Sequence, residues 1–140
     1  MSKYRDLMLF ADKLVSNAKE NMDELKPELQ VKLLADVSVL RQMAKNKNNV
    51  NIDKMREIAY EIKSIAAPLD MPEVSQAADL LWRVLEMVPA DQKLDVILES
   101  YCRTVDILVR EAKAGKGEQG KVLIHALFEL FAKHQKMWGN

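Results

Sequence analysis

Apolar residues recur along the chain at steps of three and four positions, in stretches separated by Pro, Gly or runs of Asn. This spacing places the apolar side chains on one face of an α-helix, and no stretch shows the alternation of a half-buried strand. The sequence therefore predicts six helices, over residues 3–25, 27–47, 52–67, 72–88, 90–113 and 119–138.

The helix boundaries follow from residues that start or stop helices. Pro27 and Pro72 suit the first turn of a helix, where no backbone N–H is needed, whereas Pro68 and Pro89 end the helices before them. Asn is a poor residue for a helix interior, so the Asn-rich tract 46–51 is predicted to be a loop. Pro27 is thus expected to separate the first two helices.

Short connections force neighbouring helices to pack antiparallel. We therefore expect an all-α protein, a single up-and-down antiparallel bundle over residues 1–140, in which a four-helix bundle carries additional helices. One apolar stripe per helix is predicted to build its core. The stripes of the first five helices are Tyr4, Leu7, Met8, Ala11, Leu14, Val15, Ala18 and Met22; Leu29, Leu33, Val37, Leu40 and Ala44; Ile52, Met55, Ile58, Ala59, Ile62, Ile65 and Ala66; Val74, Ala77, Ala78, Leu81, Val84, Leu85 and Val88; and Leu94, Ile97, Leu98, Tyr101, Val105, Leu108 and Val109.

Composition narrows the class of protein. The 21 Lys and Arg residues balance 21 Asp and Glu residues, so the formal net charge is zero and the electrostatic case for nucleic-acid binding falls away. No apolar run approaches the roughly 20 residues of a bilayer span, and the first residues lack the features of a signal peptide. Cys102 is the single cysteine, so no internal disulfide can form. We expect a soluble cytoplasmic protein that binds neither nucleic acid nor membrane.

Few residues offer catalytic chemistry. Residues 115–122, GKGEQGKV, approach a phosphate-binding loop, but Val122 replaces the hydroxyl residue after the lysine, and a predicted helix rather than a strand precedes the loop. His125 and His134 lie about 13 Å apart along one predicted helix and cannot share a metal ion. Cys102 is interpreted as a core residue. We therefore expect no cofactor, no metal site and no enzymatic activity.

One predicted helix face combines an exposed aromatic side chain with polar and small neighbours. When the apolar stripe of the third helix faces inward, Tyr60 faces outward. Its predicted neighbours on the helix surface are Arg56, Lys63, Ser64 and Ala67. On the next helix, the positions expected to be exposed and to extend this surface are Gln76, Asp79, Leu80 and Arg83. The pattern favours a surface that docks another protein; the alternative is an ordinary solvated helix face.

The hairpin predicted over residues 52–88 resembles the histidine-containing phosphotransfer (HPt) domains of bacterial two-component signalling. That family carries a helix reading roughly A-H-x-L-K-G-x-A-x-x-L-G, then a turn and a second helix of Leu and Ala at helical spacing. The positions similar to this pattern are Ala59, Ile62, Lys63, Ala66 and Leu69, followed by Val74, Ala77 and Leu81.

The departures from the family pattern decide what the resemblance implies. Tyr60 stands where the family has its phosphorylated histidine, Ser64 replaces the glycine that lets a partner approach, and Asp70 replaces the later turn glycine. A phenol with a pKa near 10 is a poor nucleophile at neutral pH. The resemblance implies an HPt-like bundle in which Lys63 is similar to the group that offsets phosphate charge, but from which phosphoryl transfer is absent.

Two hypotheses from different classes follow. The first is a non-catalytic, HPt-like adaptor that binds a response-regulator receiver domain or a histidine kinase through Arg56, Tyr60, Lys63, Ser64, Ala67, Gln76 and Leu80. The second is a helical structural or interaction protein unrelated to phosphorelays, in one version a homo-oligomer formed through the first two helices.

Overall fold

Every regular element in the described part of the chain is helical. The computed structural model describes the backbone of residues 2–46, 51–89, 94–115 and 117–139, and within these ranges all side chains except those of 2–5, 7, 8, 10–23, 114 and 117. The elements are α1 (Ser2–Lys45), α2 (Ile52–Ala66), α3 (Pro72–Met87), α4 (Asp95–Ile97), a π-helical turn η2 (Leu98–Cys102), α5 (Arg103–Ala114) and α6 (Gly117–Trp138). The predicted all-α class is confirmed.

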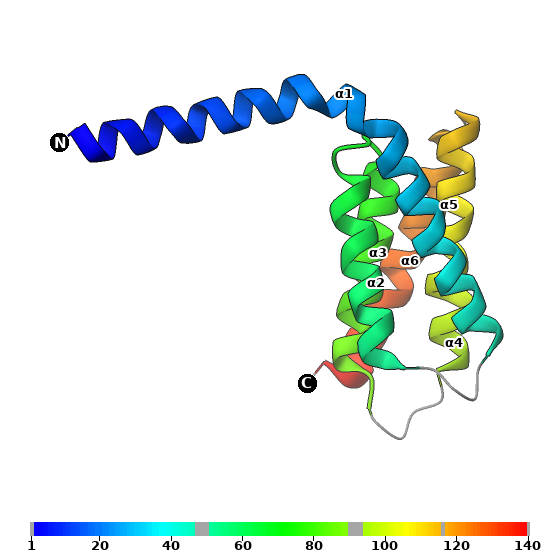
Figure 1. Ribbon diagram of the computed structural model, residues 1–140. Helices are drawn as coiled ribbons and strands as arrows, with labels where there is room; N and C mark the ends of the chain where they lie inside the picture. Colours follow the sequence, from blue (N-terminus) through cyan, green and yellow to red (C-terminus); the bar gives the residue numbers. More distant parts are fainter. Residues whose placement is uncertain (1, 47–50, 90–93, 116, 140) are drawn as a thin grey trace.

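Four helical rods form a bundle, and a fifth covers one side of it. The C-terminal half of α1, α2, α3 and the continuous rod α4–η2–α5 run alternately up and down, each in contact with its neighbours in a ring. Helix α6 packs against α3 and α5 (Figure 1). The bundle is therefore antiparallel, as the short connections predicted.

The core consists of the apolar stripes of the packed helices. Its largest fully buried side chains are Leu33, Leu40, Met55, Ile62, Val74, Leu81, Val84, Ile97, Leu98, Tyr101, Val105 and Val109. All of them belong to the stripes that the sequence predicted, which confirms the helical periodicity as the signal for burial. The side chains of the stripe predicted over residues 4–22 lie outside the described part.

Helix ends lie close to the residues expected to set them. The Asn51 side chain accepts a hydrogen bond from the Lys54 backbone N–H and so caps α2. Helix α2 ends at Ala66, two residues before Pro68, and Pro72 occupies the first turn of α3. Residues 47–50 and 90–93, which include parts of a predicted loop and of a predicted helix start, lie outside the described residues.

The separation of the first two helices at Pro27 is wrong. Helix α1 runs without a break from Ser2 to Lys45 with Pro27 inside it. Proline removes one backbone hydrogen bond and crowds the preceding turn, which bends a helix without necessarily ending it. Figure 1 shows α1 bending in its middle, so that its C-terminal half packs on the bundle while its N-terminal half projects away from it.

Helix α6 is anchored by a buried polar contact. The Tyr101 hydroxyl lies 2.7 Å from Nδ1 of His134, and the His134 ring stacks on Trp138 with 4.6 Å between ring centres. Both Tyr101 and His134 are buried, and burial raises the pKa of Tyr101. The phenol therefore stays protonated, and its O–H donates a hydrogen bond to Nδ1 of His134. The hydrogen bond and the ring stack give His134 a structural role where α6 packs on η2.

The described residues were compared with the requirements of a membrane-spanning helix and of a metal site. Across residues 2–46, 51–89, 94–115 and 117–139, no helix combines the length and the apolar character that a bilayer span requires. The same residues contain no group of three or more His, Cys, Asp or Glu side chains placed to hold a metal ion.

Candidate partner-docking surface

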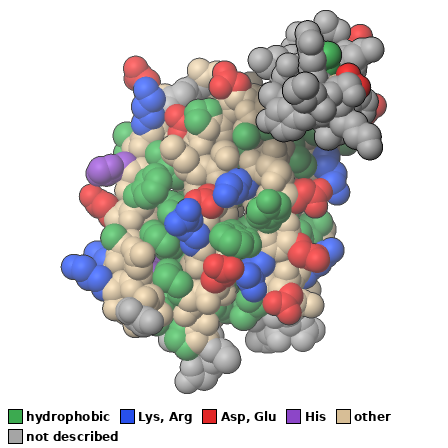
Figure 2. Space-filling view, turned by 90° about the vertical axis from the view of Figure 1, so that its left-hand side faces the viewer, with side chains coloured by type: hydrophobic (Ala, Val, Ile, Leu, Met, Phe, Trp, Pro, Cys, Tyr) green, Lys and Arg blue, Asp and Glu red, His purple; other side chains and the backbone are tan. Residues whose placement is uncertain are grey.

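The outward face of α2 and the adjoining side of α3 form the candidate surface. The apolar stripe of α2 faces the core, so the opposite side of the helix is left to solvent. Figure 2 looks onto the molecule from the side where α2 and α3 lie in Figure 1. Lys and Arg side chains alternate there with Asp and Glu, and hydrophobic side chains lie between them. The surface therefore combines apolar contact area with both signs of charge.

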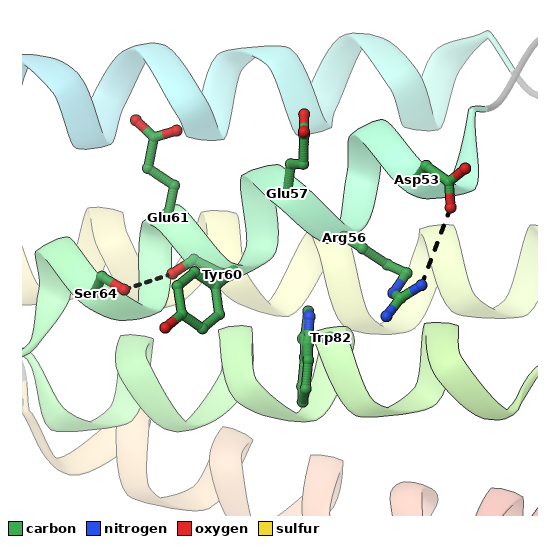
Figure 3. A pocket seen from close by; sticks show the side chains of 7 residues that line it. All are labelled: Asp53, Arg56, Glu57, Tyr60, Glu61, Ser64 and Trp82. Carbon is green, nitrogen blue, oxygen red and sulfur yellow. Dashed lines mark hydrogen bonds and ion pairs between the residues drawn. The ribbon is translucent and has the colours of Figure 1, made fainter.

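Tyr60 is the exposed aromatic residue of this surface, as predicted. Its side chain is 55% exposed, and its ring lies 6.3 Å from the Trp82 ring of α3 at a tilt of 55°. The two rings border a groove of about 750 Å³ (Figure 3). The residues that line it are Asp53, Arg56, Glu57, Tyr60, Glu61, Ser64 and Trp82.

Arg56 spans the groove from α2 to α3. Its guanidinium Nη2 lies 2.7 Å from Oε1 of Glu86, and its central carbon lies 6.0 Å from the centre of the Trp82 ring. Nη1 also lies 4.0 Å from Asp53 (Figure 3). The cation is thus held over the indole ring by charge and by ring attraction together. Arg56 therefore joins the two helices as well as lining the groove.

The small residues beside Tyr60 lie where the helix spacing placed them. Ser64 is exposed, and its hydroxyl donates a 2.9 Å hydrogen bond to the backbone oxygen of Tyr60, one turn earlier. Ala67 is exposed at the C-terminal end of α2 and lines a second hollow of about 330 Å³. Gln76 of α3 is exposed and lines the same hollow. The structure brings these residues together at the α2–α3 turn.

Lys63 is engaged in an ion-pair network. Its Nζ lies 2.9 Å from Oδ1 of Asp79, whose other oxygen lies 2.9 Å from Nε of Arg83. The Ser75 hydroxyl donates a hydrogen bond to the Lys63 backbone oxygen, which ties the two helices at the same level. Asp79 thus faces two cations, and it competes for Lys63 with any anion that approaches this surface.

Leu80 does not belong to the exposed surface that the sequence predicted. Its side chain is only 3% exposed. Helix α3 is contacted by α2, by α5 and by α6, so its buried face is wider than that of a helix packed on one side. Leu80 falls within that wider face and contributes to the core instead of to docking.

A buried carboxyl group of α1, that of Asp36, is linked through Lys32 to the groove-lining Glu61. Nζ of Lys32 in α1 lies 2.8 Å from Glu61 of α2 and 3.7 Å from Asp36. Burial, followed by the negative charge of Glu61, raises the pKa of Asp36, and the Lys32 charge offsets part of this effect. Lys32 therefore joins α1 to the groove-lining side of α2.

Four residues of the groove lie outside the surface predicted from the sequence, among them Asp53 in the first turn of α2. Glu57 and Glu61 lie one turn apart on α2, and Trp82 lies between members of the buried stripe of α3. The spacing of Glu57, Glu61 and Tyr60 on one helix could have identified the two glutamates. Trp82 depends on how α3 is rotated against α2, which the sequence pattern of one helix does not contain.

Three further residues considered from the sequence lie on α6 or in the core. Nε2 of His125 lies on the surface 3.3 Å from Glu129. Cys102 is buried in the core, as predicted, and burial raises the pKa of its thiol to about 12. Gly120, which forms part of the loop-like motif, lies inside α6 against Leu108. The glycine of a phosphate-binding loop would precede the helix instead.

Comparison with known proteins adds no relative. No family model matches the chain, and neither the curated proteins nor the solved structures contain a significant match.

Proposed function

We propose that this chain is a non-catalytic, HPt-like signalling adaptor. It docks a response-regulator receiver domain or a histidine kinase on its α2–α3 face and modulates a two-component phosphorelay without carrying phosphate. The observation that carries the proposal is the exposed Tyr60 side chain beside an open groove, at the position that the sequence resemblance aligns with the HPt histidine.

The shape of the surface favours a protein partner. The Tyr60 ring lines the groove beside Trp82, and a smaller hollow opens further along α2 at the α2–α3 turn. Exposed aromatic side chains are enriched among the residues that dominate binding energy in protein interfaces. Arg56 is held by Glu86 before any partner arrives, so less side-chain entropy is lost on binding.

The same residues favour binding without catalysis. A tyrosine in place of the histidine offers no imidazole nitrogen to accept a phosphoryl group from an aspartyl phosphate. Lys63 is paired with Asp79, so a phosphoryl group would have to displace that carboxylate before gaining the charge of the lysine. A partner would therefore find a docking surface and no phosphate acceptor.

The test is a binding titration with receiver domains and histidine kinases recovered from the source cell, with and without an aspartyl-phosphate mimic. Tyr60→Ala should weaken binding by at least about tenfold, because it removes the central exposed ring. Phe128→Ala is the matched control, since Phe128 is a 45% exposed aromatic residue on α6. Equal affinity of Tyr60→Ala and the parent for every such partner, or no binding to any of them, would contradict the proposal.

A second candidate function rests on α1. A helical interaction protein that assembles through its N-terminal helix is favoured by the projecting half of α1, where the apolar Leu9 and Leu25 are exposed. This candidate does not exclude the first, because the α2–α3 face and the projecting half of α1 are different surfaces.

A further inference from the structure

The N-terminal half of α1, residues 2–26, is termed the arm. It is helical throughout, it is about 37 Å long at 1.5 Å per residue, and it projects away from the bundle (Figure 1). An amphipathic helix in a protein draws most of its stability from packing its apolar face against another part of the protein or against a second chain. The bundle supplies no such partner along the length of the arm in Figure 1.

Beside the apolar Leu7 and Leu14, eight apolar positions follow a heptad repeat along the arm and into the first turn beyond it. They recur at alternating steps of four and three positions, which is the 3.5-residue period of a coiled-coil seam. The seam positions are Tyr4, Met8, Ala11, Val15, Ala18, Met22, Leu25 and Leu29. Eight seam positions span more than three heptads, which is the length at which such a pattern indicates a coiled coil.

The described residues show where this seam leaves the bundle. Leu33 is buried at 1% exposure, Leu29 is half-buried against the core, and Leu25 is 44% exposed, although all three lie on neighbouring parts of one helix face. Beyond Leu29 the spacing of the stripe changes to two successive steps of four, at Leu33 and Val37. The 3.5-residue period is therefore confined to the arm and its junction, where α1 departs from the bundle.

The charges of the arm permit two identical copies to associate. Residues 2–26 contain five Lys or Arg and five Asp or Glu residues, and none of these ten occupies a seam position. The arm is thus neutral overall, so two copies meet without net repulsion. Ala11 and Ala18 are small seam residues that allow two helices to approach closely.

From these observations we propose that the arm is a homodimerisation element, in which the seams of two copies of this chain pack as a two-stranded coiled coil. The proposal goes beyond the adaptor function and rests on a different surface. Closed two-fold pairing of identical subunits is the commonest form of protein assembly, and a single seam per copy is satisfied by one partner helix.

Sedimentation equilibrium of the full chain tests the proposal. The parent should be a dimer that dissociates on dilution, with a loss of helical circular dichroism as the arms separate. Val15→Asp places a carboxylate in the seam of each copy and should raise the dissociation constant by about a hundredfold or more. Ser16→Asp introduces the same charge one position away, off the seam, and should leave the dimer intact.

Each outcome bears on the proposal. A parent that is monomeric at every concentration, or a dimer that Val15→Asp does not weaken, overturns it. The near-ultraviolet signal of Trp82 and Trp138, both in the bundle, shows whether a variant has kept its fold. Tyr60→Ala should sediment as the parent does, so failure of the adaptor proposal and failure of dimerisation are separately visible.

Discussion

His134 shows at the scale of single residues how burial makes stability depend on pH. Desolvation lowers the pKa of His134 below its ordinary value of 6.5, so the unfolded chain binds this proton more readily than the folded chain. The neutral imidazole accepts the Tyr101 hydroxyl hydrogen bond, which the imidazolium could not do. The stabilising contribution is therefore complete above the ordinary pKa and is lost as the pH falls below it.

We predict that the free energy of unfolding, measured with denaturant, decreases as the pH falls from about 7.5 to about 5.5. His134→Gln keeps a side-chain acceptor but does not titrate in this range, so its stability should depend less on pH than that of the parent. His125→Gln, at an exposed position on the same helix, is the matched control for the loss of a histidine. Asp36 has a raised pKa and acts in the opposite direction, so the comparison is made between variants. Identical pH dependence in the parent and His134→Gln would contradict this assignment.

The exposure of single residues was predictable where one helix decides it. Tyr60, Ser64 and Ala67 lie on the outward face of α2 because that helix buries a single stripe. The exposure of Leu80 was predicted wrongly, because α2, η2, α5 and α6 all contact α3. The position of Trp82 over Arg56 depends on the rotation of α3 against α2, so no pattern along one helix could supply it.

At the scale of elements, two glycines of the Gly-rich stretch 114–120 differ in whether their backbone conformation requires glycine. Gly115 ends α5 at φ 74° with open space around its missing side chain, so its contribution is purely conformational. Gly120 lies within α6, where an added Cβ would meet Leu108 at 3.4 Å and Glu73 at 3.8 Å. These are ordinary contacts, so the helical conformation there does not require glycine.

We predict changes of opposite sign at these two positions. Gly115→Ala should lower the free energy of unfolding by about 1 kcal/mol, because alanine is strained in the left-handed conformation. Gly120→Ala should raise it by up to about 1 kcal/mol, because alanine has the higher helix propensity. Urea unfolding of both variants beside the parent measures the difference. A higher free energy of unfolding for Gly115→Ala would contradict the prediction, because it would mean that the left-handed conformation at residue 115 is not required to end α5.

The element pattern also shows what sequence spacing could and could not predict. Ile97, Tyr101 and Val105 follow one another at steps of four, a row that would drift by about 40° per step on a regular α-helix. The π-helical turn η2 widens the helix here and keeps all three buried. In α1, the sequence identified Pro27 as a position where the helix is perturbed, but not that the helix continues through it. That continuation depends on the packing of α1 against α2 and α5, which the spacing within one helix does not contain.

At the scale of the whole molecule, the buried Cys102 reports on cooperative opening of the bundle. It is the single cysteine of the chain, it is buried, and burial raises its pKa to about 12, which leaves little reactive thiolate. We predict that a thiol reagent labels the native protein slowly, and that the rate rises with denaturant in parallel with global unfolding. Rapid labelling in native buffer would instead indicate local opening beside Arg41 and Asp106, which line a small hollow at Cys102.

Dimerisation through the arm would set the number of α2–α3 faces that one assembly carries. Two copies joined through their arms would present two α2–α3 faces, since the arm and that face occupy different parts of the chain. A partner with two matching sites would then bind the second face as an intramolecular event, at an effective concentration set by the length and stiffness of the paired helices. The arm would thus convert a modest affinity at each Tyr60 face into avidity for partners that are themselves dimeric.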